Sequence, residues 1–166
     1  VTVALEGRRP LIAEVQALIA PSNAPQPRRV TSGLDSARTA MLLGILERRA
    51  GIKTSAADCF VATVGGVKLN EPATDLATAL AIVSSVTDKP LPANSIALGE
   101  LGLSGELRPI TSLERRLSEA ARLGFTSAIV PATDKAFNTP KGMKVHQART
   151  IAEAIALTRN DPAPQF

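Results

Sequence analysis

The stretch from Gly65 to Ala77 is the part of this 166-residue chain best arranged for chemistry. Two glycines follow a strand-like apolar run, and Pro72 then opens a helical pattern that is apolar on almost every face up to Val86. The first turn of a helix leaves backbone N–H groups free, and glycines let another chain come close. A nucleophile would be well placed here, but the residue after the proline is Ala73, which has no reactive group.

Glycine spacing elsewhere in the chain excludes the common nucleotide-binding motifs. Gly99, Gly102 and Gly105 do not have the spacing G-x-G-x-x-G, and the residues after them indicate a strand rather than the helix that this motif requires. The pattern G-x-x-x-x-G-K-S/T does not occur in the sequence, so the chain has no P-loop.

A single cysteine and a single histidine limit the metal and redox chemistry of the chain. Cys59 lies in an apolar run, where it is more typical of a small buried hydrophobe than of a reactive thiol. One cysteine allows neither a disulfide within the chain nor a cysteine-rich zinc site. His146 lies in a predicted strand and is more typical of a structural residue than of a catalytic one. We therefore expect no metal and no cofactor in this chain.

Composition indicates a globular protein with an aliphatic core. Hydrophobic residues make up 45% and charged residues 20% of the chain, which excludes a disordered protein. Aromatic residues make up only 2%, which argues against a base-stacking platform for single-stranded nucleic acid. The formal net charge of +4 is compatible with a nucleic-acid partner. No apolar run is long enough to span a membrane and no signal peptide is visible, so we expect no membrane partner and a cytoplasmic location.

Hydrophobic periodicity and breakers predict one mixed α/β domain over residues 1–159, with helices on a curved sheet, and a frayed tail over 160–166. The predicted strands cover 2–5, 11–19, 58–64, 95–100, 106–110, 127–130 and 143–148. The predicted helices cover 32–50, 73–86, 111–123 and 150–158. Ser32 is the expected N-cap of the first helix and Gly51 its end, while Thr111–Glu114 and Thr150–Glu153 have the spacing of capping boxes.

The segment Gly99–Ile110, with Arg115–Ala120 and Leu123–Phe125 after it, resembles the proteolytic domain of the Lon family. The chain is more closely similar to the Lon-like C-terminal domain of a group of bacterial DNA-repair and recombination proteins. Earlier segments, including Gly33–Asp35 and Gly65–Val67, fit the same resemblance, which covers nearly the whole chain. It implies the Lon-protease fold, a mixed α/β fold related to a domain of a ribosomal protein.

The same resemblance supplies a test of peptidase activity. Lon peptidases use a serine at the start of the core helix and a lysine from a later segment; the hydroxyl attacks a carbonyl while a neutral amine takes its proton. Here Ala73 stands at the serine position and Glu114 at the lysine position. The resemblance therefore implies an inactive protease. Thr74 is the nearest hydroxyl, about 100° around the helix, and a degenerate peptidase that uses it remains an alternative.

Structural roles explain the residues at these positions. Glu114 has the position of the reciprocal partner in a capping box, and Ala73 suits close packing at a helix start. Asp75 lies in the first helical turn, where a carboxylate interacts favourably with the helix dipole, and Arg108 is its candidate partner.

The resemblance also implies a longer protein around this chain. A zinc-binding segment and a RecA-like ATPase domain would precede it, so ATP, Mg and Zn are expected only in those missing domains. The implied assembly is a homo-oligomer, a hexameric ring that drives branch migration, and the implied partners are DNA and recombinase-type repair proteins. We expect the chain itself to serve as an architectural module.

Basic side chains are the candidates for contact with DNA phosphates. They are Arg28, Arg29, Arg38, Arg48, Arg49, Lys53, Arg108, Arg115, Arg116 and Arg122. In one hypothesis they form a sequence-independent DNA-binding surface on a ring scaffold. In a second, the chain only supports oligomerisation, and the arginines are solvated charges on helix faces.

Overall fold

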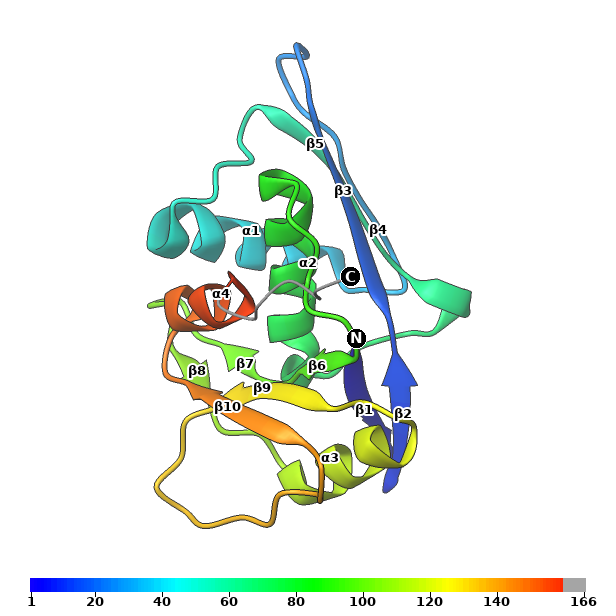
Figure 1. Cartoon of the computed structure of the whole chain (residues 1–166). Helices are drawn as coiled ribbons and strands as arrows, with labels where there is room; N and C mark the ends of the chain where they lie inside the picture. Colours follow the sequence, from blue (N-terminus) through cyan, green and yellow to red (C-terminus); the bar gives the residue numbers. More distant parts are fainter. Residues whose placement is uncertain (160–166) are drawn as a thin grey trace, which may run out of the picture.

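Helix α2 (Asp75–Thr87) lies at the centre of the fold, with the strands and the other helices around it (Figure 1). This computed structural model describes residues 1–159, so the tail predicted for 160–166 lies outside the described residues. All α2 residues from Asp75 to Val83 are buried. A helix that is apolar on nearly every face is expected to be enclosed in this way.

The strands within residues 1–159 form four small sheets. β1 (Thr2–Glu6) and β2 (Arg9–Ala13) make an antiparallel hairpin. A second sheet has the order β3-β5-β4, in which β3 (Val15–Pro21) is antiparallel and β4 (Arg29–Ser32) parallel to β5 (Ala57–Thr63). A third, parallel sheet has the order β10-β9-β6, made of β6 (Ser95–Ala97), β9 (Ser127–Pro131) and β10 (Lys144–Ala148). β7 (Glu100–Leu101) and β8 (Leu107–Arg108) form a short antiparallel pair.

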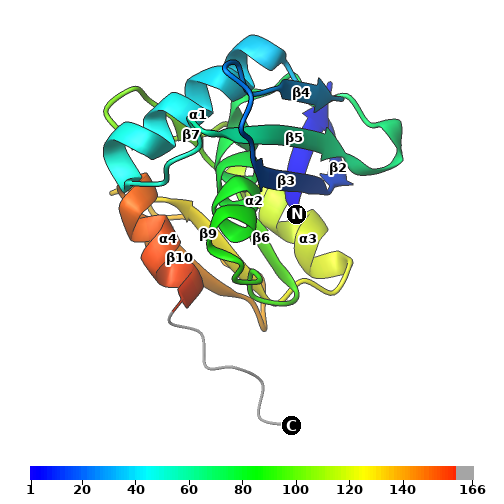
Figure 2. The ribbon, with the colours of Figure 1, turned by 90° about the horizontal axis from the view of Figure 1, so that it is seen from above.

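Three further helices cover different sides of this arrangement. They are α1 (Ser36–Ala50), α3 (Leu113–Arg122) and α4 (Ile151–Arg159). α1 and α4 pack on one side of α2, while the β3-β5-β4 sheet packs on the other (Figures 1 and 2). α3 packs against β1 and β2. Two short 3-10 turns, η1 (Val64–Gly66) and η2 (Pro72–Thr74), lie between β5 and α2.

The core is aliphatic, as the composition predicts, and it has two parts. The larger part lies between α1, α2, α4 and the β3-β5-β4 sheet and includes Leu42, Leu46 and Leu76. The smaller part lies around α3 and includes Val3 and Leu117. The fold is therefore mixed α/β, as expected from the sequence.

The predicted strand over 11–19 is wrong, because the chain forms two strands there. β2 ends at Ala13 and β3 begins at Val15. The break at Glu14 lets β2 pair with β1 while β3 pairs with β5. β4 was not predicted: residues 29–31 were assigned to no element, and Ser32 was assigned to the start of the first helix. The strands predicted over 95–100 and 106–110 are shorter than expected.

Two of the predicted helix caps are wrong. Asp35, not Ser32, caps α1: its side chain accepts a hydrogen bond from Arg38 N at 2.7 Å. Ser32 instead belongs to β4, where it pairs with Ala62. At α3, no side-chain cap forms, and the Glu114 carboxylate accepts a hydrogen bond from Asn138 N at 2.9 Å instead of closing a capping box.

Two other predicted helix ends agree with the structure. Gly51 closes α1 with a φ of 67°, the left-handed conformation that glycine adopts without strain. At α4, Thr150 Oγ1 accepts a hydrogen bond from Glu153 N at 3.2 Å, as its capping box requires. The Glu153 carboxylate in turn accepts from Arg149 N at 2.7 Å rather than from Thr150 N.

Candidate functional site

The segment from Gly65 to Ala77 has the predicted geometry of a strand, a glycine turn and a helix start. Gly65 and Gly66 follow β5 with φ values of 74° and 72°, which turn the chain back across the fold. Leu69 N then donates to Gly33 O at 2.8 Å, which links this segment to a residue three positions before α1. The α-helix begins at Asp75, two residues later than expected, because Pro72–Thr74 forms the 3-10 turn η2.

The backbone N–H groups of Thr74, Asp75 and Leu76 at this helix start are already bonded, contrary to the sequence-based expectation of free donors. Thr74 N donates to Glu71 O at 3.1 Å, and Asp75 N donates to Pro72 O. Leu76 N donates to Gly99 O at 3.0 Å. These three donors would otherwise be the ones available to an incoming oxyanion.

Ala73 is a packing residue at this position. It is 5% exposed, and its carbonyl oxygen accepts a hydrogen bond from Gly99 N at 2.9 Å. A Cβ on Gly99 would lie 3.1 Å from Leu107 Cδ2 and 3.3 Å from Pro131 Cγ, so the space around this residue is closely packed.

The hydroxyl of Thr74, the residue after Ala73, also has a hydrogen-bond partner. Thr74 is buried, and its Oγ1 donates to Glu71 O at 2.7 Å. The Thr74 carbonyl accepts from Thr78 Oγ1 at 3.2 Å. Glu114, at the other candidate position, lies exposed on α3 with its carboxylate bonded to the Asn138 N–H. The hydroxyl of Thr74 is therefore bonded to a backbone carbonyl, which cannot act as a base and take its proton.

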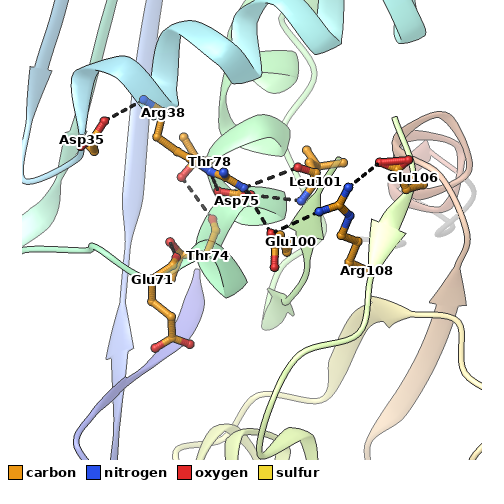
Figure 3. A network of polar contacts seen from close by, with 10 residues as sticks. All are labelled: Asp35, Arg38, Glu71, Thr74, Asp75, Thr78, Glu100, Leu101, Glu106 and Arg108. Carbon is orange, nitrogen blue, oxygen red and sulfur yellow. Dashed lines mark hydrogen bonds and ion pairs between the residues drawn. The ribbon is translucent and has the colours of Figure 1, made fainter. Parts of the chain in front are cut away.

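Asp75 is bound by Arg38 rather than by Arg108, which corrects the pairing expected from the sequence (Figure 3). Its Oδ1 accepts from Arg38 Nε at 3.0 Å, its Oδ2 pairs with Arg38 Nη2, and Leu101 N donates to the same Oδ2 at 3.0 Å. Arg108 pairs instead with Glu100 at 3.9 Å and with Glu106 at 3.7 Å. The hydrogen bond to Asp75 is the main reason why the pKa of Arg38 is raised.

A pocket of about 310 Å³ opens beside this ion pair, between the start of α1 and the segment that leads into α2. Its apolar lining includes Leu34 and Leu69, and its polar lining includes Arg38 and Asp75. Of its polar lining residues, Arg38, Thr74 and Asp75 are bonded to other protein groups. Among residues 1–159, no three His, Cys, Asp or Glu side chains are grouped so that they could hold a metal ion.

Arg116 does not lie on the surface, although its sequence position places it among the DNA-contact candidates. It is 1% exposed, donates to Val3 O at 3.0 Å and to Thr111 O at 2.9 Å, and pairs with the Glu71 carboxylate. Arg38 is also ion-paired, with Asp75. Both side chains therefore bind partners within the fold, and Arg116 is too buried to contact DNA.

The other eight candidates are exposed, but they lie in separate regions. Arg28 and Arg29 are at β4, Arg48, Arg49 and Lys53 at the end of α1, Arg108 on β8, and Arg115 and Arg122 on α3. Arg29 is held by Thr54 O at 2.8 Å, and Arg122 is bonded to Glu119 at 2.6 and 3.0 Å.

Two further arginines, Arg8 and Arg9, lie near α3 and were not among the candidates chosen from the sequence. Arg115 Nη1 donates to Arg8 O at 3.2 Å, which places the turn between β1 and β2 beside α3. The pKa of Glu119 is lowered first by its hydrogen bond to Arg122, and the charge of Arg9 adds to this effect. Arg8 in the β1–β2 turn and Arg9 at the start of β2 thus lie near α3, which carries Arg115; two consecutive arginines in the hairpin were the available signal. We call these three residues the hairpin cluster.

No helix among residues 1–159 combines the length and the apolar character needed to cross a membrane.

Comparison with known proteins gives one family match and many curated relatives. DNA repair protein RadA of Mycolicibacterium smegmatis is 49% identical over 159 residues, which cover 96% of this chain and 34% of that protein. The RadA proteins of Salmonella typhimurium and Escherichia coli are 47% and 45% identical over 157 residues, 95% of this chain and 34% of each relative. The chain thus spans about a third of the length of these relatives. A family model described as subunit ChlI of Mg-chelatase matches residues 43–134, and because this match covers more than half of the chain, the chain belongs to that family.

Proposed function

We propose that this chain is the catalytically inactive, Lon-like C-terminal domain of a RadA-type, ATP-dependent DNA-repair protein, where it serves as a ring scaffold and a sequence-independent DNA-contact surface. The identity of 43–49% to proteins named DNA repair protein RadA supports the connection to DNA repair. ATP, Mg and Zn would bind in the other two thirds of such a protein, and branch migration would be an activity of the whole.

The observation that carries the inactive assignment is the helix start around Ala73. A Ser–Lys peptidase needs a free hydroxyl, a neutral amine and unoccupied oxyanion donors. Here the position of the hydroxyl is a buried methyl group, and the N–H groups of Thr74, Asp75 and Leu76 are bonded to backbone carbonyls. The remaining polar side chain, Asp75, is held by Arg38. The contacts around Ala73 thus stabilise the fold at the place where a peptidase would have its active site.

The hairpin cluster is the best candidate for a DNA-contact surface. It combines exposed arginines from the β1–β2 hairpin and from α3, two elements that lie side by side. Arginine guanidinium groups bind phosphate oxygens in fixed fork geometry, and such contacts position DNA without reading its sequence. Binding of this kind weakens steeply as the salt concentration rises.

Charge reversal in the complete RadA-type protein tests this surface. The variant Arg8→Glu, Arg9→Glu, Arg115→Glu is compared with the matched control Arg48→Glu, Arg49→Glu, Lys53→Glu, which changes the charge equally at the end of α1. We expect only the hairpin variant to lose DNA affinity, with the salt slope falling by about one for each lost phosphate contact. Fluorescence anisotropy with duplexes of two unrelated sequences measures the affinity, and light scattering measures the ring.

The outcomes separate the hypotheses. Lost DNA binding with rings intact supports the proposed surface. Lost rings in the hairpin variant favour the alternative in which the chain is an oligomerisation module alone. Unchanged affinity and salt slope in the hairpin variant overturn the DNA-contact assignment.

A further inference from the structure

Two side chains hold the outer edge of β1. The other edge of this strand pairs with β2, so the backbone groups of alternate residues point outward. Val3 O accepts a hydrogen bond from Arg116 Nη1 at 3.0 Å, and Leu5 N donates to Glu71 Oε2 at 2.9 Å. From Val3 onward, an arginine of α3 and a glutamate of the segment before α2 thus take the place of a neighbouring strand.

Arg116 and Glu71 also bind each other. The Arg116 guanidinium, which is buried, pairs with the Glu71 carboxylate, whose side chain is 25% exposed. Arg116 Nε donates in addition to Thr111 O at 2.9 Å, just before α3. In Figure 3 the Glu71 side chain points away from the Arg38–Asp75 pair. We call Glu71 and Arg116 the edge pair, because together they connect the start of α3 to the edge of β1.

A hollow beside the edge pair separates the hairpin from the segment that carries Glu71. This hollow of about 820 Å³ lies between residues 4–7 and Leu11 of the hairpin and residues 67–72. Within residues 1–159, the bond from Leu5 N to Glu71 is the only hydrogen bond that joins the hairpin to residues 67–72. A two-stranded hairpin is at best marginally stable alone. The position of its turn therefore depends on its packing against α3 and on the edge pair.

The edge pair lies next to both halves of the hairpin cluster along the chain. Arg8 in the turn follows Leu5 by three residues, and Arg115 directly precedes Arg116. Arg115 Nη1 donates to Arg8 O at 3.2 Å, so the two halves are already in contact. Side chains that must bind several phosphates of one duplex at the same time lose affinity when their spacing is not fixed, because the cost of ordering them is then paid on binding.

We propose that Glu71 and Arg116 are positioning residues that fix the hairpin cluster in its DNA-binding arrangement. This inference rests on the proposed function, since it assumes that the hairpin cluster binds DNA. The edge pair itself does not contact DNA: Arg116 is 1% exposed, and its charge is matched by Glu71 within the fold. It acts by holding α3 and β1 at one separation.

Glu71→Gln in the complete RadA-type protein tests the proposal. Glutamine has the length of glutamate and an oxygen that can accept from Leu5 N, but it lacks the charge that faces Arg116. We expect DNA affinity to fall by about fivefold, an effect typical of a residue that acts through others. The salt slope should fall by about one, as for one lost phosphate contact. Fluorescence anisotropy measures both, at a temperature at which circular dichroism shows the variant to be folded.

Asp75→Asn is the matched control, because it removes the carboxylate charge from the other buried arginine pair, with Arg38. It should also lower the stability of the protein, but DNA affinity and salt slope should stay unchanged. Hydrogen exchange measured by mass spectrometry adds a direct view of the hairpin. Residues 1–13 should exchange faster in Glu71→Gln and at the normal rate in Asp75→Asn.

A second variant serves if Glu71→Gln does not fold. Glu71→Asp keeps the charge that Arg116 needs but is one methylene shorter, so it weakens the contact with Leu5 N. We expect the same faster exchange of residues 1–13 and a smaller loss of DNA affinity.

Two results overturn the proposal. The first is a folded Glu71 variant with normal DNA affinity and salt slope. The second is an equal loss of affinity in Glu71→Gln and Asp75→Asn, because the loss would then follow stability and not the hairpin. Failure of the proposed function looks different: the hairpin charge-reversal variant would itself keep normal DNA affinity, and the edge pair would have no DNA-binding surface to position.

Discussion

Arg38 on α1 binds both carboxylate oxygens of Asp75 at the start of α2, and the same carboxylate accepts the backbone N–H of Leu101 on β7. One side chain thus joins three segments that are far apart in the sequence (Figure 3). Asp75 is 3% exposed, whereas the Arg38 side chain is 30% exposed. Loss of Arg38 would therefore leave a buried charge, whereas loss of Asp75 would leave a charge that can reach water.

Removal of Arg38 should destabilise the protein more than removal of Asp75. Arg38→Ala leaves a buried carboxylate without its cation, which costs about 3 kcal/mol of the free energy of unfolding. Asp75→Ala leaves a guanidinium that can turn toward water, and we expect a loss of about 2 kcal/mol. Urea denaturation measures both variants, and the double variant should lose less than the sum. A loss for Asp75→Ala that exceeds the loss for Arg38→Ala would contradict this asymmetry.

In the Arg38–Asp75 pair, the position of Asp75 could be predicted from the sequence but its partner could not. The acidic residue in the first turn and the apolar character of α2 follow from local patterns, and the structure confirms both. The choice of Arg38 over Arg108 is tertiary, because both lie more than 30 positions away and no local pattern distinguishes them. Gly51 at the end of α1 was predictable because its signal is local.

Errors at the caps and at Arg116 have related causes. Ser32 and Asp35 both have cap chemistry, and only the pairing of Ser32 with β5 decides which of them caps α1. Arg116 is next to Arg115 in the sequence and was assigned the same surface role. Arg116 lies three residues after Leu113 and four before Ala120, so helix periodicity places it on the buried face of α3. Its acceptor Val3 O is 113 positions away and could not be inferred from a local pattern.

Substitution of two neighbouring arginines on α3 should change the stability of the protein by very different amounts. Arg116→Ala removes a buried guanidinium that serves Val3 O, Thr111 O and the Glu71 carboxylate, and we expect a loss of about 3 kcal/mol. Arg115→Ala removes an exposed side chain and should change stability by less than about 0.5 kcal/mol. Thermal unfolding of both variants makes the comparison, and similar shifts in the two would argue against the buried role of Arg116.

Two glycines form a matched pair for a test of backbone geometry. Gly33 has a φ of 77°, and a Cβ there would overlap Thr63 Oγ1 and Val67 O. We expect Gly33→Ala to destabilise the protein by about 2 kcal/mol or more. Gly44 lies within α1 with open space around it, so Gly44→Ala should stabilise the helix by about 0.5–1 kcal/mol. Denaturant titrations that gave both variants the same sign would contradict this account.

The buried thiol of Cys59 should give the protein an alkaline instability. Burial raises the pKa of Cys59, so the folded state keeps its proton at a pH where the unfolded thiol, with a pKa of about 8.5, has lost it. The unfolded state then binds fewer protons, and the free energy of unfolding falls as pH rises above about 8.5, by at most about 1.4 kcal/mol per pH unit.

Cys59→Ala isolates this effect. The chain has no tyrosine, so no phenol titrates in the same range. The pKa of the Val1 amine is lowered by burial, but this group is common to both proteins and cancels in their difference. We expect the difference in unfolding free energy to be constant below pH 8 and to shrink above it; a difference that stays constant to pH 10 would exclude a raised thiol pKa.

Restoring the two side chains of a Ser–Lys dyad should not restore peptidase activity. In the variant Ala73→Ser, Glu114→Lys, the new hydroxyl would lie at a buried position whose neighbouring donors, Thr74 N and Leu76 N, are bonded to Glu71 O and Gly99 O. An attacking hydroxyl without oxyanion donors loses about 3–4 kcal/mol of transition-state stabilisation for each missing donor. Fluorescent casein and a serine-reactive fluorophosphonate probe measure turnover and labelling, with Glu114→Lys alone as the control. We expect neither signal; hydrolysis by the unmodified protein that Thr74→Ala abolishes would instead establish Thr74 as a nucleophile.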